Sequence, residues 1–183
     1  MAQMDKYKKV SLNGGAILGL IITLIIIGGL IFLMVPTEKE RIYNAYSAQS
    51  GNTLPVNHNL DEVSFKKLKK EIAKMEEDEF LIVYYGNTGC SNCVAQLGNI
   101  VTKTRDVLKV EEVLYLDSTG DFKTADIREA FGNDNIGDKT PEVWVFKGGQ
   151  YLVSTVDYFN KDEETLSWDT FWLRVEHEMG LNA

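Results

Sequence analysis

The stretch FLIVYYGNTGCSNC, from Phe80 to Cys93, decides the fold that the sequence predicts. It opens with six apolar residues rich in strand formers, and such a run is typical of a strand buried on both faces of a sheet. It closes on Cys90 and Cys93, the only two cysteines of the chain. The residues that follow have helical periodicity to about Lys109. The cysteine pair is therefore expected where a buried strand passes into a helix.

That position gives the two cysteines different chemistry. Residues three apart lie on one face of a helix, so Cys90 and Cys93 can close a disulfide. The free amides and the dipole at a helix N-terminus stabilise a thiolate, which lowers the pKa of Cys90. Cys93 lies one turn deeper and is more protected. The pattern predicts that Cys90 attacks and that Cys93 resolves the mixed disulfide.

Two other roles for the pair remain open. An inert disulfide on a scaffold kept for binding a partner has the same spacing. A structural zinc site needs four ligands, and neither His58 nor His177 is closely spaced with the cysteines, so we expect no metal ligands. Thiol–disulfide exchange is the preferred interpretation, and a non-catalytic adaptor in secretion or assembly is the alternative.

The rest of the domain alternates between helices and strands. The patterns predict helices at 61–79, 93–109, 126–131 and up to Met179, and strands at 113–117, 142–146 and 151–156. Gly148 and Gly149 separate the last two strands and predict a hairpin, because both turn residues need positive φ. Asn160 and Glu163 have capping-box spacing before the last helix. This order predicts a small mixed sheet with helices on both faces.

These motifs together resemble thioredoxin over roughly residues 80–180. In that family a strand leads to C-x-x-C at a helix start, and a later cis-proline stands directly before a hairpin with a glycine turn; Pro141 fits that proline. The resemblance implies an α/β, thioredoxin-like three-layer fold with a mixed central sheet. It also implies that Pro141 lies beside the dithiol and that the backbone of Thr140 pairs with a substrate peptide. The activity implied is that of a thiol-disulfide oxidoreductase without a cofactor, recycled by a redox partner.

The chain departs from the thioredoxin pattern around the dithiol. Tyr84 stands where thioredoxin has a buried Asp, Gly89 where it has Trp, and Ser91-Asn92 where it has Gly-Pro. The reference pKa of tyrosine is about 10, so Tyr84 is a poor base at neutral pH. Ser91 and Asn92 can donate hydrogen bonds to the attacking thiolate. Whether the pair oxidises, reduces or isomerises its substrates stays open.

A second, looser resemblance concerns the pattern Y-x-G-x-x-x-C-x-x-C. It is matched by Tyr84, Gly86, Cys90 and Cys93. Small thioredoxin-like accessory proteins associated with bacteriocin production in Gram-positive bacteria share this pattern. The likeness points to the same superfamily as the first resemblance.

An apolar run precedes this domain. Residues 16–35, AILGLIITLIIIGGLIFLMV, carry no charge, and twenty residues at 1.5 Å each give about 30 Å of helix, enough to cross a bilayer. A cleaved signal peptide has a shorter apolar region and small residues at its cut. The following stretch, FLMVPTEKE, offers no such site. The sequence therefore predicts a retained transmembrane anchor over 16–35.

Basic residues flanking this run set the expected orientation. Three lysines precede it and two basic residues follow it closely: Lys6, Lys8 and Lys9, then Lys39 and Arg41. The excess favours a cytoplasmic tail over residues 1–15 of a single-pass cell-membrane protein. Residues 36–60 are then a linker, and residues 61–183 are the thioredoxin-like domain outside the membrane. Cytoplasmic exposure of the domain is the alternative.

The charge of the chain limits its partners. It holds 27 acidic against 19 basic residues, a net charge of −8. Nucleic-acid binding depends on Lys and Arg contacts to phosphates, so we expect no nucleic-acid partner. The expected substrates are the thiols or disulfides of exported proteins.

Overall fold

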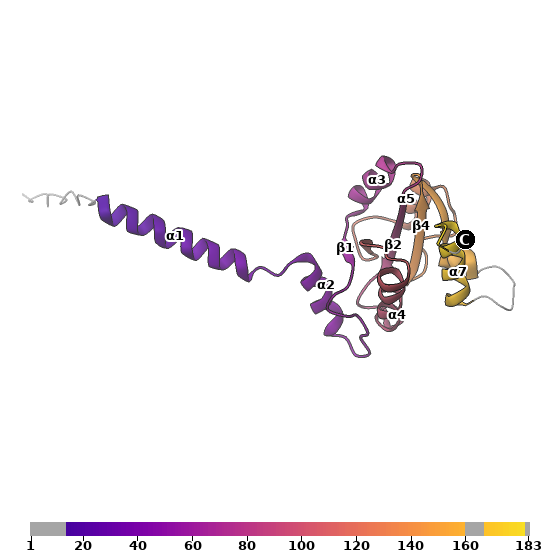
Figure 1. Cartoon of the computed structure of the whole chain (residues 1–183), viewed down its shortest axis with the longest axis horizontal. Helices are drawn as coiled ribbons and strands as arrows, with labels where there is room; N and C mark the ends of the chain where they lie inside the picture. The colour runs from indigo at the N-terminus through magenta and orange to yellow at the C-terminus, as the bar shows by residue number, and fades with distance from the viewer. Residues whose placement is uncertain (1–13, 160–166, 182–183) are drawn as a thin grey trace, which may run out of the picture. The chain divides into compact units, whose positions relative to one another are not determined.

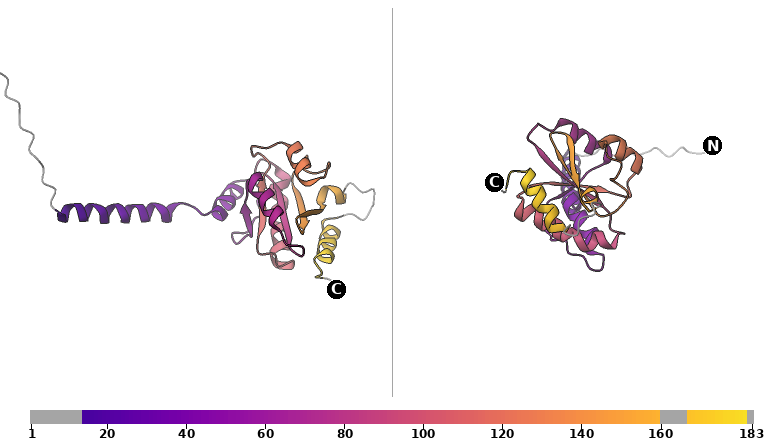
Figure 2. Two further views of the ribbon diagram at one scale, coloured as in Figure 1. Left: turned by 90° about the horizontal axis from the view of Figure 1, so that it is seen from above. Right: turned by 90° about the vertical axis from the view of Figure 1, so that its right-hand side faces the viewer.

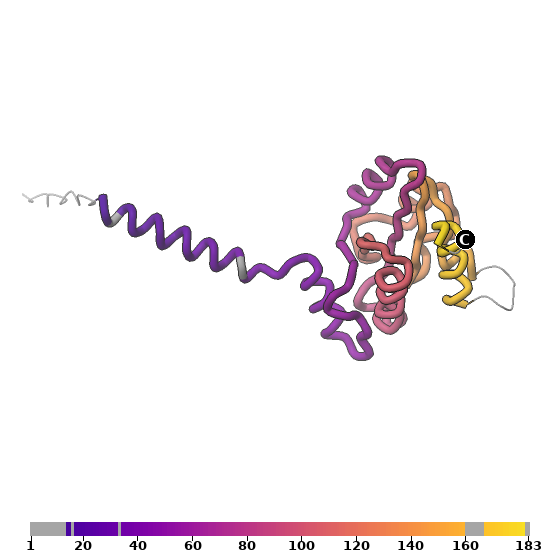
Figure 3. Tube along the Cα trace, in the orientation of Figure 1, coloured from indigo at the N-terminus to yellow at the C-terminus, as the bar shows by residue number. Residues whose placement is uncertain are grey.

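The computed structural model describes residues 14–159 and 167–181, and Figure 3 follows their Cα trace. The chain divides into two compact units, Met1–Pro36 and Thr37–Ala183. The first contains one helix and the second contains the sheet, the cysteine pair and all the other helices that are described.

Helix α1, Gly14–Met34, is the regular element of the first unit. It has 21 residues, none of them charged, and its isoleucine side chains are exposed. Within residues 14–159 and 167–181, no helix meets the combined length and hydropathy needed to cross a membrane. The anchor over 16–35 therefore stays a prediction.

The second unit is built on a five-stranded mixed sheet with the strand order β1-β3-β2-β4-β5. Its strands, some of them labelled in Figure 1, are β1 (Leu60–Glu62), β2 (Phe80–Gly86), β3 (Val113–Asp117), β4 (Glu142–Lys147) and β5 (Gln150–Ser154). β1, β3 and β2 are parallel, whereas β4 is antiparallel to both β2 and β5. All the strands except β1 were predicted to within two residues at each end.

Strand β2 is buried on both faces, as its apolar run predicts. Ile82 and Tyr84 belong to one hydrophobic cluster, and Val83 and Tyr85 belong to the other. None of the four is more than 5% exposed. Because successive side chains of a strand point to opposite faces, β2 contributes to the cores on both sides of the sheet.

Helices cover both faces of the sheet. In the right-hand view of Figure 2, α3 and α5 lie on one side, and α4 and α7 lie on the other. The helices of the second unit are α2 (Glu38–Ser47), α3 (Phe65–Lys74), α4 (Ser91–Thr102), α5 (Thr124–Phe131), α6 (Thr155–Phe159) and α7 (Trp168–Glu178), with a π-helical turn, η1 (Lys103–Val107), after α4. The predicted α/β layering around a mixed sheet is confirmed. The capping box predicted at Asn160 and Glu163 lies outside the described residues.

The hairpin between β4 and β5 turns at Gly148 and Gly149, as predicted. Their φ angles are 55° and 76°. L-residues with side chains rarely adopt such angles, whereas glycine adopts them freely. The pair therefore sets the register in which Lys147 faces Gln150.

The segment predicted as a linker, residues 36–60, differs from that prediction. Helix α2 begins with a capping box between Thr37 and Glu40 and buries Ile42 and Tyr46. Both side chains belong to the cluster under α4. Only two of the ten residues of α2 are buried, so its pattern is too sparse to be distinguished from a solvated stalk.

The helix predicted over 61–79 also differs. Its first residues, Asp61 and Glu62, belong to β1, and the helix itself is α3, Phe65–Lys74. Ser64 caps α3 by accepting a hydrogen bond from the amide of Lys67. A strand of three residues is too short for alternation to be recognised in the sequence.

A close approach joins the segment after α2 to α4. The amide of Gly98, in α4, donates to Thr53 Oγ1 at 3.1 Å. A Cβ at Gly98 would lie 2.2 Å from the carbonyl oxygen of Thr53. Real Cβ atoms do not approach oxygen this closely, so the contact requires glycine at position 98.

Candidate active site

The two cysteines are joined as a disulfide at the start of α4. Their Cα atoms are 5.1 Å apart. Cys90 is the N-cap residue in an extended conformation, and its Sγ accepts a hydrogen bond from the amide of Cys93 at 3.1 Å. Cys93 is fully buried, whereas Cys90 is half-buried. Only Cys90 is thus open to an incoming thiolate.

The helix N-terminus supplies the chemistry expected for Cys90. Its sulfur lies beside an amide that has no partner within the helix, at the positive end of the helix dipole. A thiolate there is stabilised. Ser91 and Asn92 are exposed, and neither side chain hydrogen-bonds Cys90 in the part of the chain that is described.

Asn87, which the sequence analysis did not single out, shapes the loop before Cys90. Its Oδ1 accepts the amide hydrogen of Gly89 at 2.8 Å, and its Nδ2 donates to Ser118 Oγ at 2.5 Å. Its carbonyl oxygen accepts from the amide of Cys90 at 3.4 Å. An Asn that bonds the backbone two residues on is a common turn-former, and this signal was present in NTGC. Gly89 itself is exposed.

The Thr140–Pro141 segment lies against the dithiol. The peptide bond between the two residues is cis, as expected. The carbonyl oxygen of Thr140 is 3.5 Å from Cys90 Sγ. Both residues are half-buried, so part of this backbone faces solvent next to the reactive sulfur. Residues 50 positions apart in the sequence thereby form one site.

A hollow of about 370 Å³ opens beside this segment. It is lined by Asn92, Gln96, Lys139, Thr140, Pro141, Thr155, Val156, Phe159 and Trp168. Trp168 thus forms part of a groove wall, whereas Trp144 and Trp172 are core residues. The hollow adjoins both the dithiol helix and the cis-proline.

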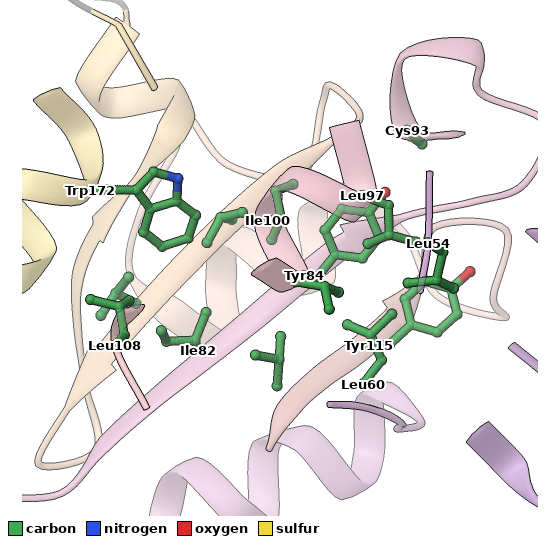
Figure 4. Close-up of a cluster of buried hydrophobic side chains, with 14 of the residues drawn as sticks. Leu54, Leu60, Ile82, Tyr84, Cys93, Leu97, Ile100, Leu108, Tyr115 and Trp172 are labelled. Atoms are coloured by element: carbon green, nitrogen blue, oxygen red, sulfur yellow. The ribbon is translucent and has the colours of Figure 1, made fainter. Parts of the chain in front are cut away.

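Tyr84 lies behind the dithiol helix, in the same buried cluster as Cys93 (Figure 4). Its ring stacks on that of Tyr115 at 5.8 Å, and Tyr115 packs edge-on against Tyr46 at 6.1 Å. The hydroxyls of Tyr46 and Tyr84 are buried without a partner at hydrogen-bonding geometry among the described residues. Burial raises the pKa of all three phenols, so they stay neutral.

Gly86 leaves room for the Tyr84 hydroxyl. A Cβ at Gly86 would lie 2.6 Å from that oxygen. The Y-x-G part of the motif is therefore a packing requirement, because a larger residue two positions on would displace the tyrosine. Tyr84 thus puts a neutral ring at the position where thioredoxin, which the motifs resemble, has a buried Asp.

The buried acid of this site is Glu142, which the sequence analysis also missed. It is 0% exposed and follows Pro141 directly. Its carboxylate accepts hydrogen bonds from the amides of Gly137 and Lys139 and from the indole of Trp144. Burial raises the pKa of Glu142, and these hydrogen bonds oppose the rise. A charged residue opening the apolar strand EVWVF was the available signal.

No metal site is formed in the described ranges, where no three His, Cys, Asp or Glu side chains gather around a common point. His58 is buried, and its two ring nitrogens bond the Lys39 carbonyl and the Leu60 amide. This histidine ties α2 to β1 and does not approach the cysteines.

Solved structures similar to this chain include several thioredoxins. Thioredoxin f from spinach chloroplast is 12% identical, with 74% of this chain and 93% of that chain covered at a TM-score of 0.47. Thioredoxin O2 from Arabidopsis thaliana, in its oxidised state, is 12% identical, with 68% and 95% covered at 0.43. Thioredoxin from Nicotiana alata is 15% identical, with 54% and 81% covered at 0.43. No protein-family model and no curated protein matches the chain.

Proposed function

We propose that this chain is a thiol-disulfide oxidoreductase that acts on polypeptide substrates through Cys90 and Cys93. The observation that carries the proposal is the placement of Cys90. This half-buried sulfur caps α4, is bonded to a fully buried partner and lies 3.5 Å from the carbonyl oxygen of Thr140. A structural disulfide needs neither the helix N-terminus nor the cis-proline beside it.

The exchange balances as two thiolate substitutions. A substrate thiolate attacks Cys90 Sγ, a new S–S bond forms, and Cys93 leaves as a thiolate that takes a proton. A second substrate thiolate then attacks the substrate sulfur of this mixed disulfide and releases Cys90. The substrate loses two electrons and gains a disulfide, while the protein gains a dithiol. The same steps in reverse reduce a substrate, and a separate redox partner restores the starting form.

The Thr140–Pro141 backbone supports binding of an extended substrate chain. Backbone pairing gives affinity that is independent of sequence, as in other cases of strand addition. The hollow lined by Pro141, Phe159 and Trp168 lies next to it. A polypeptide joined to Cys90 can therefore be held on both sides of the mixed disulfide.

We also propose that residues 16–35 anchor the chain in the cell membrane, with residues 1–15 in the cytoplasm and the second unit outside. Support comes from the uncharged apolar run and from the three lysines before it. The substrates are then exported proteins. An impermeant thiol reagent should label Cys90 in intact cells after mild reduction; labelling that needs cell lysis would overturn this orientation.

Replacement of Cys93 tests the exchange reaction. Cys93→Ala removes the resolving thiol, so Cys90 should form stable adducts that appear on non-reducing gels of cell extracts. Cys90→Ala is the matched control and should form none, because Cys93 is buried. If Cys93→Ala traps no adduct, and the wild-type couple does not respond to glutathione buffers, the groove serves a non-catalytic adaptor.

A further inference from the structure

Glu142 has no part in the exchange steps, yet its carboxylate accepts three hydrogen bonds. Its Oε2 accepts from the Gly137 amide at 3.0 Å and from Trp144 Nε1 at 2.6 Å. Its Oε1 accepts from the Lys139 amide at 3.1 Å. Two of these three donors belong to the loop that ends at Thr140.

The burial of this carboxyl group requires an explanation. Glu142 is fully buried beneath that loop, and it makes no ion pair with a described residue. Placing an acid in an apolar environment is costly unless hydrogen bonds compensate it. A neutral apolar residue at this position of β4 would avoid the cost but leave the amides of Gly137 and Lys139 without acceptors.

Further side chains hold the same loop from the α5 side of the sheet. The carbonyl oxygen of Gly137 accepts from the hydroxyls of Tyr85 at 3.3 Å and Thr124 at 3.1 Å. The carbonyl oxygen of Ile136 accepts from Arg128 Nε at 3.4 Å. The loop is thus bonded at Ile136, Gly137 and Lys139, and Thr140 follows directly.

We propose that Glu142 is a positioning residue that fixes the Thr140 backbone for pairing with a polypeptide substrate at Cys90. The carboxylate binds Lys139, one residue before Thr140, and is itself one residue beyond Pro141. Glu142 therefore constrains the chain on both sides of Thr140, through the Lys139 amide before it and through its own position after Pro141. This inference rests on the proposed exchange activity and names the residue that sets its substrate geometry.

The test compares a polypeptide with a small disulfide. Reduced wild type and Glu142→Gln are reacted with a decapeptide that carries one cysteine as its 2-mercaptoethanol mixed disulfide, and with bis(2-hydroxyethyl) disulfide. An amide presents one acceptor oxygen in place of two, so one loop amide loses its partner. We expect kcat/KM for the peptide to fall about tenfold, since small misplacements of a binding group slow reaction by such factors. The small disulfide, which is too short to pair along Thr140, should react at the wild-type rate.

Asp157→Asn is the matched control. Asp157 accepts from the side-chain amides of Asn133 at 2.7 Å and Asn135 at 3.2 Å, at the far end of the same loop. Its replacement should leave the ratio of the two rates unchanged. If Glu142→Gln does not fold, Glu142→Asp, which keeps the charge and withdraws the oxygens, makes the same comparison.

The outcomes separate the two proposals. A Glu142 variant that slows both substrates equally, or neither, overturns the positioning role. Wild type that reacts with neither substrate overturns the exchange activity, whatever Glu142 does.

Discussion

The face of the sheet under α4 and the face under α3 and α5 bury different polar groups. Under α4, Cys93 shares its cluster with Tyr84 and Tyr115, whose phenols stay neutral. On the opposite face, the carboxyl group of Glu142 lies beneath the loop before Thr140 and receives three hydrogen bonds. The polar groups around Cys93 are neutral phenols, whereas the carboxylate on the opposite face accepts three hydrogen bonds.

This difference concerns where a buried acid lies relative to the two cysteines. Thioredoxin, which the motifs resemble, has a buried Asp at the position that Tyr84 occupies in this chain. In this chain a buried acid, Glu142, lies on the other face, next to the cis-proline. The acid therefore bonds the loop whose backbone we propose pairs with a substrate, while Cys93 lies among neutral aromatic rings.

Tyr84→Asp should have the largest effect among the variants that test this difference between the two faces. It places a carboxylate in the buried cluster that holds Cys93 and removes the ring stacked on Tyr115. We expect the free energy of unfolding to fall by about 4 kcal/mol, as for a large core truncation combined with an unpaired buried charge. Urea denaturation at pH 7 measures the change. A loss below about 1 kcal/mol would show that this face accommodates an acid after all.

His58→Ala tests how firmly α2 is fixed to the same face. The Nδ1 of His58 accepts from the Leu60 amide and its Nε2 bonds the Lys39 carbonyl, so losing both should cost about 2 kcal/mol. Burial lowers the pKa of folded His58, so the wild type should lose stability as pH falls below 6.5. The variant should lack this slope. Thermal melts between pH 5 and 7 check both effects, with the exposed His177→Ala as control.

The pH dependence of stability tests the environment of Glu142 on the opposite face. Since the pKa of folded Glu142 is raised above its ordinary value of 4.5, the folded protein holds this proton more tightly than the unfolded chain. The contribution of Glu142 to stability is thus greatest below pH 4.5 and declines as pH rises through the folded pKa. The free energy of unfolding of wild type relative to Glu142→Gln, measured by urea denaturation, should fall between pH 4.5 and 7 by about 1.4 kcal/mol for each unit of raised pKa. A constant difference would mean that burial does not perturb this acid.

Tyr84→Phe should have the smallest effect. The hydroxyl is buried without a partner at hydrogen-bonding geometry among the described residues, so its removal should change the free energy of unfolding by less than about 1 kcal/mol. The potential of the cysteine couple in glutathione buffers should stay the same. A shifted potential would reveal that the phenol acts on Cys93 and is not only packing.

The sequence predicted those elements that carry strong local signals. The apolar run of β2, the glycine pair at 148 and 149 and the proline at 141 each predicted a feature that the structure contains. β1 was not recognised, and the residues of α2 were assigned to a linker, because a three-residue strand and a helix with two buried residues carry little periodicity. Their burial depends on contacts with distant parts of the chain.

The candidate site likewise contains residues that the sequence predicted and residues that it did not. The cysteine pair and Thr140–Pro141 were identified from spacing and resemblance. The role of Glu142 was not, because its partners Gly137 and Lys139 become donors only after the loop folds back over β4. Tyr46 likewise comes from a segment that has no visible connection with the cysteines until Tyr115 brings them into one cluster.

The glycine at position 98 gives α4 a notch into which the Thr53 backbone fits. The notch lies about two turns from Cys90 along the same helix, so the fit fixes both the rotation of α4 about its axis and its axial position. The direction in which the Cys90 sulfur points therefore depends on a segment that lies far from Cys90 in the sequence. Any enlargement at Gly98 would turn the reactive cysteine, even though no atom near the sulfur had been altered.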